Sequence, residues 1–271
     1  MKALPDFSEV LRFKPGKSRL KDFNPTGTQG VEHDARAQQA LEQNLKRLSE
    51  IQYRLYASKA RALLIVLQGI DAAGKDGTIR HVMTGLNPQG CKVTSFKKPT
   101  SEELDHDFLW RIHKAVPGKG EIGIFNRSHY EDVLVVRVHK LVPKEVWKAR
   151  FAQINSFEKL LAESGTVVLK FFLHLSKEEQ KARLQARIND PEKNWKLSPQ
   201  DFEERPLWKK YQQAFEDALS KCATERAPWF VIPSDKKWFR NLAVSQIIVK
   251  ALEGLKLDLP KPAPGLERYR L

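Results

Sequence analysis

Several short runs of mostly apolar residues punctuate the chain, and each is bounded by residues typical of turns. Runs of this length without strict alternation are typical of strands that are buried on both faces of a parallel sheet. The sequence therefore predicts strands at positions 62–68, 91–96, 121–125, 166–175 and 229–232.

Between these runs, apolar residues recur at the spacing of amphipathic helices. Ser176 and Glu179 form a capping-box pattern, and Ser234 or Asp235 is expected to cap the last helix. The predicted helices cover positions 31–56, 75–86, 101–115, 143–165, a segment from 176, and a segment that ends near 252. Strands that alternate with helices predict an α/β fold, a three-layer arrangement in which helices cover both faces of a mainly parallel sheet.

The chain is expected to divide into three parts. Residues 1–30 are rich in Lys, Pro and Gly, which predicts an irregular arm on the surface or on a partner subunit. Residues 31–254 form the folded domain. Residues 255–271 are a Pro-rich tail outside the core.

The turn after the first strand has the spacing of a phosphate-binding loop. Gly69, Gly74 and Lys75 match G-x-x-x-x-G-K between a buried strand and a helix. Glycines let several backbone N–H groups point at one anion, and the helix N-terminus adds its positive dipole end. An ordinary strand–turn–helix is the alternative. The residues expected to contact phosphate here are Gly69, Ala72, Ala73, Gly74, Lys75, Asp76, Gly77, Thr78 and Arg80.

Carboxylates and arginines in the strand-end loops suit phosphoryl transfer. Asp71 lies inside the first loop, and Arg127 and Asp132 follow the third strand. Magnesium needs only one or two protein carboxylates, so Asp71 and Asp132 are candidate metal ligands. Arg127 can bind phosphate oxygens bidentately. One departure from the common loop pattern is Asp76, which replaces the usual Ser or Thr.

The formal net charge of +14 predicts a polyanionic partner, such as nucleic acid, an anionic membrane or inorganic polyphosphate. Positive charge is concentrated in residues 176–205, where Arg183 and Arg187 share one helix face. A basic helix and loop of this kind suits a lid over a polyanion. A solvated helix whose lysines pair with glutamates is the alternative.

The cysteines and the apolar runs of the sequence indicate the cellular compartment of the protein. Cys91 and Cys222 do not suggest a disulfide framework. The first residues lack the apolar core of a signal peptide, and no apolar run reaches membrane-spanning length. These features predict a cytoplasmic protein without a membrane partner.

The motifs GIDAAGKDGT, SFKKPT, IFNRSHYEDV and DPEKNWK, in this order, resemble the polyphosphate kinase type 2 family. The resemblance runs from about residue 23 to residue 252. It implies a P-loop kinase core with a helical lid and magnesium-dependent phosphoryl transfer between polyphosphate and AMP, ADP or ATP, with Mn²⁺ as an alternative ion. It also implies a homodimer or homotetramer. Asp71, Lys75, Arg127 and Asp132 match the family's Walker A and Walker B residues, Arg183 and Arg187 fall in its lid, and Asp76 is the family's own residue.

The segment IFNRSHYEDV, with Asn126 and Glu131 flanking Arg127, resembles the members that phosphorylate both AMP and ADP. We therefore expect both to be acceptors. An ATP-dependent nucleotide or small-molecule kinase is one alternative, and a basic nucleic-acid-binding protein is another. The second alternative requires aromatic platforms interleaved with cations. Trp and Phe fall mostly on apolar stripes, so no nucleic-acid partner is expected.

Overall fold

The computed structural model describes residues 3–255, 257–265 and 268–269. Its centre is a five-stranded sheet in the order β2-β3-β1-β4-β5, and all the strand pairs are parallel. The strands are β1 Ala62–Gln68, β2 Cys91–Ser95, β3 Ile122–Asn126, β4 Thr166–His174 and β5 Trp229–Pro233. The α/β fold and the five predicted strands are confirmed.

Strand β1 lies in the middle of the sheet and is buried along its whole length. Successive side chains of a strand point to opposite faces. Accordingly, Leu63 and Ile65 belong to one apolar core, and Leu64 and Val66 belong to the other. A strand covered on both sides must be apolar throughout, which explains the unbroken run in the sequence.

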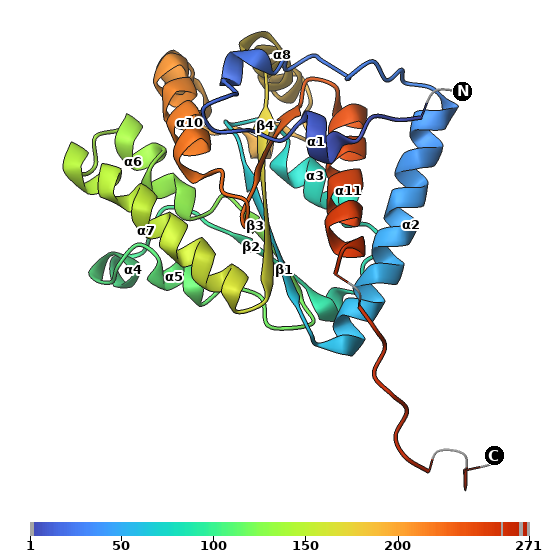
Figure 1. Ribbon diagram of the computed structural model, residues 1–271. Helices are drawn as coiled ribbons and strands as arrows, with labels where there is room; N and C mark the ends of the chain where they lie inside the picture. Colours follow the sequence, from blue (N-terminus) through green and yellow to red (C-terminus); the bar gives the residue numbers. More distant parts are fainter. Residues whose placement is uncertain (1–2, 256, 266–267, 270–271) are drawn as a thin grey trace.

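Helices cover both faces of the sheet, as Figure 1 shows. The first layer contains α1 Phe7–Val10, α2 Ala35–Ser58, α3 Lys75–Val82 and α11 Lys237–Glu253. The opposite layer contains α5 Trp110–His113, α6 Val135–Val138, α7 Lys144–Glu163 and α10 Trp208–Cys222. The remaining helices are α4 Ser101–Asp105, α8 Lys177–Ile188 and α9 Pro199–Glu204, with short 3₁₀ turns at Leu20–Asp22, Pro88–Gly90, His129–Asp132, Asn194–Lys196 and Arg205–Leu207.

The loops that carry the candidate residues meet at one edge of the sheet. Leu67 of β1 pairs with Asn126 of β3, so these strands end side by side. Ligands of open α/β sheets bind beyond such carboxyl ends. The parallel register therefore brings the phosphate loop and the loop after β3 together.

The N-terminal segment differs from its prediction. Phe7, Leu11 and Phe13 are at most 1% exposed, and Arg12 bridges to Phe230 of β5. These three residues therefore complete the core beside the edge strand β5 and do not lie on the surface as expected, while residues 14–17 of the same segment are exposed. Residues 1–2, 256, 266–267 and 270–271 of the predicted arm and tail lie outside the described residues.

Some helix ends also differ. The predicted helix at 101–115 is two short helices, because Asp107 caps a new turn through the N–H of Leu109. Neither Ser234 nor Asp235 caps α11, which begins after Lys236 without a side-chain cap. Asp235 instead accepts a hydrogen bond from the N–H of Ser176. The long helix α10 was not predicted.

Candidate active site

Residues 69–74 form a tight loop between β1 and α3. A Cβ on Gly69 would lie 2.9 Å from Cβ of Ala73 and 3.0 Å from the carbonyl oxygen of Leu173, so only glycine fits there. Gly74 has a φ of +107°, in the region that favours glycine. The loop thus has the shape that the spacing predicted, and it leads directly into the N-terminus of α3.

Lys75 lies under this loop and is 9% exposed. Its Nζ donates hydrogen bonds to the carbonyl oxygens of Gly69 at 2.8 Å and Ile70 at 3.3 Å. Burial, together with the nearby charge of Arg127, lowers the pKa of Lys75 to about 8. The nearby carboxylates compensate the buried ammonium only in part, so an anion at this loop would stabilise it.

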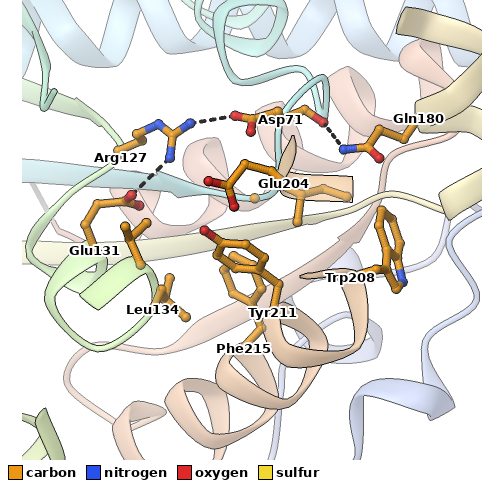
Figure 2. A pocket seen from close by; sticks show the side chains of 12 residues that line it. Asp71, Arg127, Glu131, Leu134, Gln180, Glu204, Trp208, Tyr211 and Phe215 are labelled. Atoms are coloured by element: carbon orange, nitrogen blue, oxygen red, sulfur yellow. Dashed lines mark hydrogen bonds and ion pairs between the residues drawn. The ribbon is translucent and has the colours of Figure 1, made fainter. Parts of the chain in front are cut away.

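Arg127 connects the loop after β3 to the phosphate loop. Its Nη2 lies 2.6 Å from Oδ1 of Asp71, and its Nη1 lies 3.0 Å from Oε2 of Glu131. Figure 2 shows these contacts at one end of a pocket. The two carboxylates raise the pKa of Arg127, which keeps the guanidinium charged. The arrangement places a fixed cation between two carboxylates at the strand ends.

The backbone of Arg127 is strained, with a φ of +62°. Its N–H is held by the carbonyl oxygen of Leu67, and the next residue, Ser128, accepts a hydrogen bond from Gln68. Such strain persists only where the surroundings determine the conformation. Sequence alone gave no sign of it.

The residues after Ser128 anchor the loop in the core. His129 and Tyr130 are fully buried, and both contact Oε1 of Glu158, at 3.1 and 2.8 Å. Glu158 also pairs with Lys170 at 2.5 Å. Lys170 keeps the pKa of Glu158 low despite its burial. His129 is thus structural, and this buried network holds the loop in place.

Asp132 forms its ion pair with Arg150. Its Oδ1 lies 2.8 Å from Nη1 of Arg150, and Asp132 is not among the residues that line the pocket. Burial raises the pKa of Asp132 to about 6, and Arg150 opposes this shift. The carboxylate that faces Asp71 across Arg127 is that of the neighbouring Glu131.

The other residues predicted near the loop have varied surroundings. Asp76 is exposed and accepts a hydrogen bond from Nδ2 of Asn126 at 2.6 Å. Thr78 is buried, and its hydroxyl donates to the carbonyl oxygen of Gly74. Arg80 is exposed on the next turn of α3, and Gly77 lies in the first turn.

Arg183 and Arg187 of α8 have different environments. The Arg183 side chain is 9% exposed, and its Nη1 donates to the carbonyl oxygens of Ala72 at 3.0 Å and Ala73 at 3.2 Å. Its Nη2 donates to the carbonyl oxygens of Ser234 and Asp235. Arg183 therefore fastens the phosphate loop to the loop after β5. Arg187 is half-buried in the last turn of the helix.

A pocket extends from the phosphate loop between α6 and α10. Asp71, Arg127 and Glu131 form its polar end, and Glu204 lies beside them (Figure 2). The remaining lining residues are Gly69, Ile70, Leu134, Val135, Gln180, Trp208, Tyr211 and Phe215. Sequence analysis missed this apolar end, since Tyr211 and Phe215 have the spacing of an ordinary core stripe.

Glu204 is held at the wall of the pocket. Its Oε1 lies 2.9 Å from Nε2 of His139. Burial and the contact with Glu204 keep the pKa of the Tyr211 hydroxyl well above its ordinary value. This wall presents a carboxylate and a neutral phenol next to apolar side chains.

A metal ion would have to share its coordination with substrate. The described residues contain no group of three or more His, Cys, Asp or Glu side chains that could hold an ion. Asp71 and Glu131 nevertheless supply hard oxygen ligands, which suit Mg²⁺ when substrate phosphates complete the coordination. The donor set thus fits an ion that arrives with its phosphates. No helix among the described residues is long and apolar enough to cross a membrane.

Comparison with known proteins gives concordant matches. Residues 31–260 match the family model described as Polyphosphate kinase 2 (PPK2). The AMP/ADP-polyphosphate phosphotransferase of Meiothermus ruber is 52% identical over 254 residues, 93% of this chain and 95% of the relative. The ADP-polyphosphate phosphotransferase of Rhodopseudomonas palustris is 48% identical, over 85% of this chain and 84% of the relative.

Similarity of structure agrees with similarity of sequence. The crystal structure of polyphosphate kinase 2 from Arthrobacter aurescens has a TM-score of 0.94 and 43% identity, over 99% of this chain and 96% of that one. This chain therefore shares its fold with that structure over 99% of its length. On these grounds, the chain belongs to the polyphosphate kinase 2 family.

Proposed function

We propose that this protein transfers a phosphoryl group from inorganic polyphosphate to both AMP and ADP, with Mg²⁺ as the metal and Mn²⁺ as an alternative. One observation carries this proposal. The site brings two cations, Lys75 and Arg127, together with the carboxylates of Asp71 and Glu131, and a pocket with aromatic walls continues from Arg127. A nucleotide has the complementary chemistry, a charged phosphate joined to a planar apolar base.

In this arrangement the donor lies on the phosphate loop. Lys75 exchanges its two loop carbonyls for oxygens of the donor phosphate. The net charge of +14 favours encounter with a long polyanion. The similar proteins are named as polyphosphate phosphotransferases, which supports polyphosphate rather than ATP as the donor.

The acceptor lies in the pocket, with its base between Trp208 and Tyr211 and its phosphate at Arg127. Arg127 contacts the transferring group, and its bonds to Asp71 and Glu131 fix its direction. Transfer of a phosphoryl group depends mainly on positioning and on compensation of charge. Lys75 and Arg127 supply both in this proposal.

We propose Asp71 and Glu131 as the carboxylates toward the metal, with Glu131 in place of Asp132. Each of these carboxylates uses one oxygen for Arg127, and an ion held by the two side chains would offset the negative charge of the phosphate oxygens during transfer. Asn126, the residue before Arg127, carries a neutral amide that donates to Asp76 and repels neither a monophosphate nor a diphosphate. This combination supports the use of both AMP and ADP.

A matrix of donors and acceptors tests the donor assignment. Polyphosphate and ATP are each offered with AMP, and polyphosphate is offered with ADP, with Mg²⁺ or with a chelator. We expect products from polyphosphate with both acceptors, and none when the chelator is present. Transfer from ATP to AMP at a rate equal to or above that from polyphosphate would favour an ordinary nucleotide kinase instead.

A further inference from the structure

Arg240 in the first turns of α11 is a buried cation that is not part of the proposed chemistry. It is 2% exposed. Its Nε and Nη2 both donate to Oδ1 of the neighbouring Asn241, at 3.2 and 2.9 Å. Within the described part of the chain, no carboxylate forms an ion pair with it.

The Arg240 guanidinium lies directly against the phosphate loop. A Cβ on Gly74 would lie 2.0 Å from its Nη1, and a Cβ on Gly77 would lie 3.1 Å from its Nη2. The same hypothetical Cβ on Gly74 would lie 3.6 Å from Nη1 of Arg183. Both guanidinium groups therefore lie on the side of Gly74 to which a Cβ would project, and glycine at positions 74 and 77 makes the close approach of Arg240 fit.

This arrangement is unfavourable in the absence of an anion. Burial lowers the pKa of Arg240 to about 10, and the charge of Arg183 contributes to this shift. The group still carries its charge at neutral pH. A buried charge without an opposite partner destabilises a fold, unless a ligand supplies the missing charge.

We infer that Arg240 is an electrostatic positioning residue of the phosphate site, whose charge is compensated by a phosphate bound on the other side of the loop. It does not touch the phosphate, because the loop peptide lies between them. Its charge acts across a short, water-poor distance, where Coulomb interactions are strong. This inference rests on the proposed function only in taking the loop as the site of the polyphosphate donor.

The test measures binding of tripolyphosphate to the protein by calorimetry, without nucleotide or metal. Asn241→Asp is the central variant, because it keeps the shape of residue 241 and gives Arg240 a carboxylate partner. We expect Asn241→Asp to bind tripolyphosphate about tenfold more weakly or worse, since the charge that attracts the phosphate is then neutralised. Its melting temperature is expected to equal or exceed that of the wild type.

Arg240→Gln and Arg240→Lys separate charge from packing. The glutamine variant is expected to lose binding about tenfold, and the lysine variant is expected to stay within about threefold of the wild type. Arg226→Gln is the control, because Arg226 is exposed on the surface and pairs with Glu163. It is expected to bind like the wild type.

Several outcomes would overturn the inference. If Asn241→Asp binds tripolyphosphate as tightly as the wild type does, Arg240 only fills space behind the glycines. Equal losses in Arg240→Gln and Arg240→Lys would point to the shape of the guanidinium and not its charge. A wild-type protein that does not bind tripolyphosphate contradicts the proposed donor site itself, which distinguishes that failure from failure of the role of Arg240.

Discussion

Lys75→Ala is expected to abolish nearly all transfer of phosphoryl groups from polyphosphate. Lys75 is the buried cation at the end of the phosphate loop. In the proposed function its Nζ stabilises the negative charge of the donor phosphate. Its loss removes stabilisation of the transition state on the order of 3–5 kcal/mol, which corresponds to a fall in kcat of several hundredfold or more. Initial rates at saturating AMP and polyphosphate measure this effect.

Lys159→Ala is the matched control. Lys159 lies on α7, its side chain is 63% exposed, and it forms a long ion pair with Glu163. The same change in side chain there should leave kcat unaltered. A Lys75→Ala protein that folds and keeps more than about a tenth of the wild-type rate would remove Lys75 from the mechanism.

Glu131→Gln is expected to lose much more activity than Asp132→Asn, although the two residues are neighbours. Glu131 holds Arg127 toward Asp71, so its neutral variant loses both the direction of Arg127 and a proposed metal ligand. We expect a fall in kcat of about a hundredfold. Added Mg²⁺ should restore only part of the lost rate.

Asp132 pairs with Arg150 outside the pocket. Asp132→Asn should therefore lower the melting temperature slightly and keep kcat within about fivefold of the wild type. The kcat values of the two variants, measured at saturating Mg²⁺, decide between Glu131 and Asp132 as the metal carboxylate. If Asp132→Asn is the inactive variant and Glu131→Gln retains its activity, the metal carboxylate is Asp132, as the motif alone suggested.

The sequence contained the local signals of the fold. The apolar run of β1 and the glycines after it predicted a buried strand and its loop, because both depend on residues adjacent in the chain. The order of the strands was not predictable, since it depends on the pairing of β1 with both β3 and β4. The N-terminal segment was misread for the same reason, as Phe7 and Phe13 are buried only by distant elements.

At the site, the sequence could not predict the direction in which the side chains point. The motif contains Glu131 and Asp132 side by side, and only the 3₁₀ turn at His129–Asp132 determines which carboxylate faces Asp71. Basic residues in α8 suggested a lid, but spacing cannot show that Arg183 bonds to the carbonyl oxygens of the phosphate loop. Arg240 lies far along the chain from Gly74, so no local pattern connects the two.

The most direct test of the proposed activity is a time course with AMP, polyphosphate and Mg²⁺ and no other nucleotide. Lys75→Ala, purified in the same way and supplied with ADP and Mg²⁺ without polyphosphate, serves as the control for contaminating adenylate kinase, which would convert ADP to ATP and AMP. We predict that AMP declines, that ADP appears first and that ATP follows it. AMP that stays unchanged while ADP in a parallel reaction is converted to ATP would contradict the use of both acceptors. No conversion of either nucleotide by polyphosphate would contradict the proposed function.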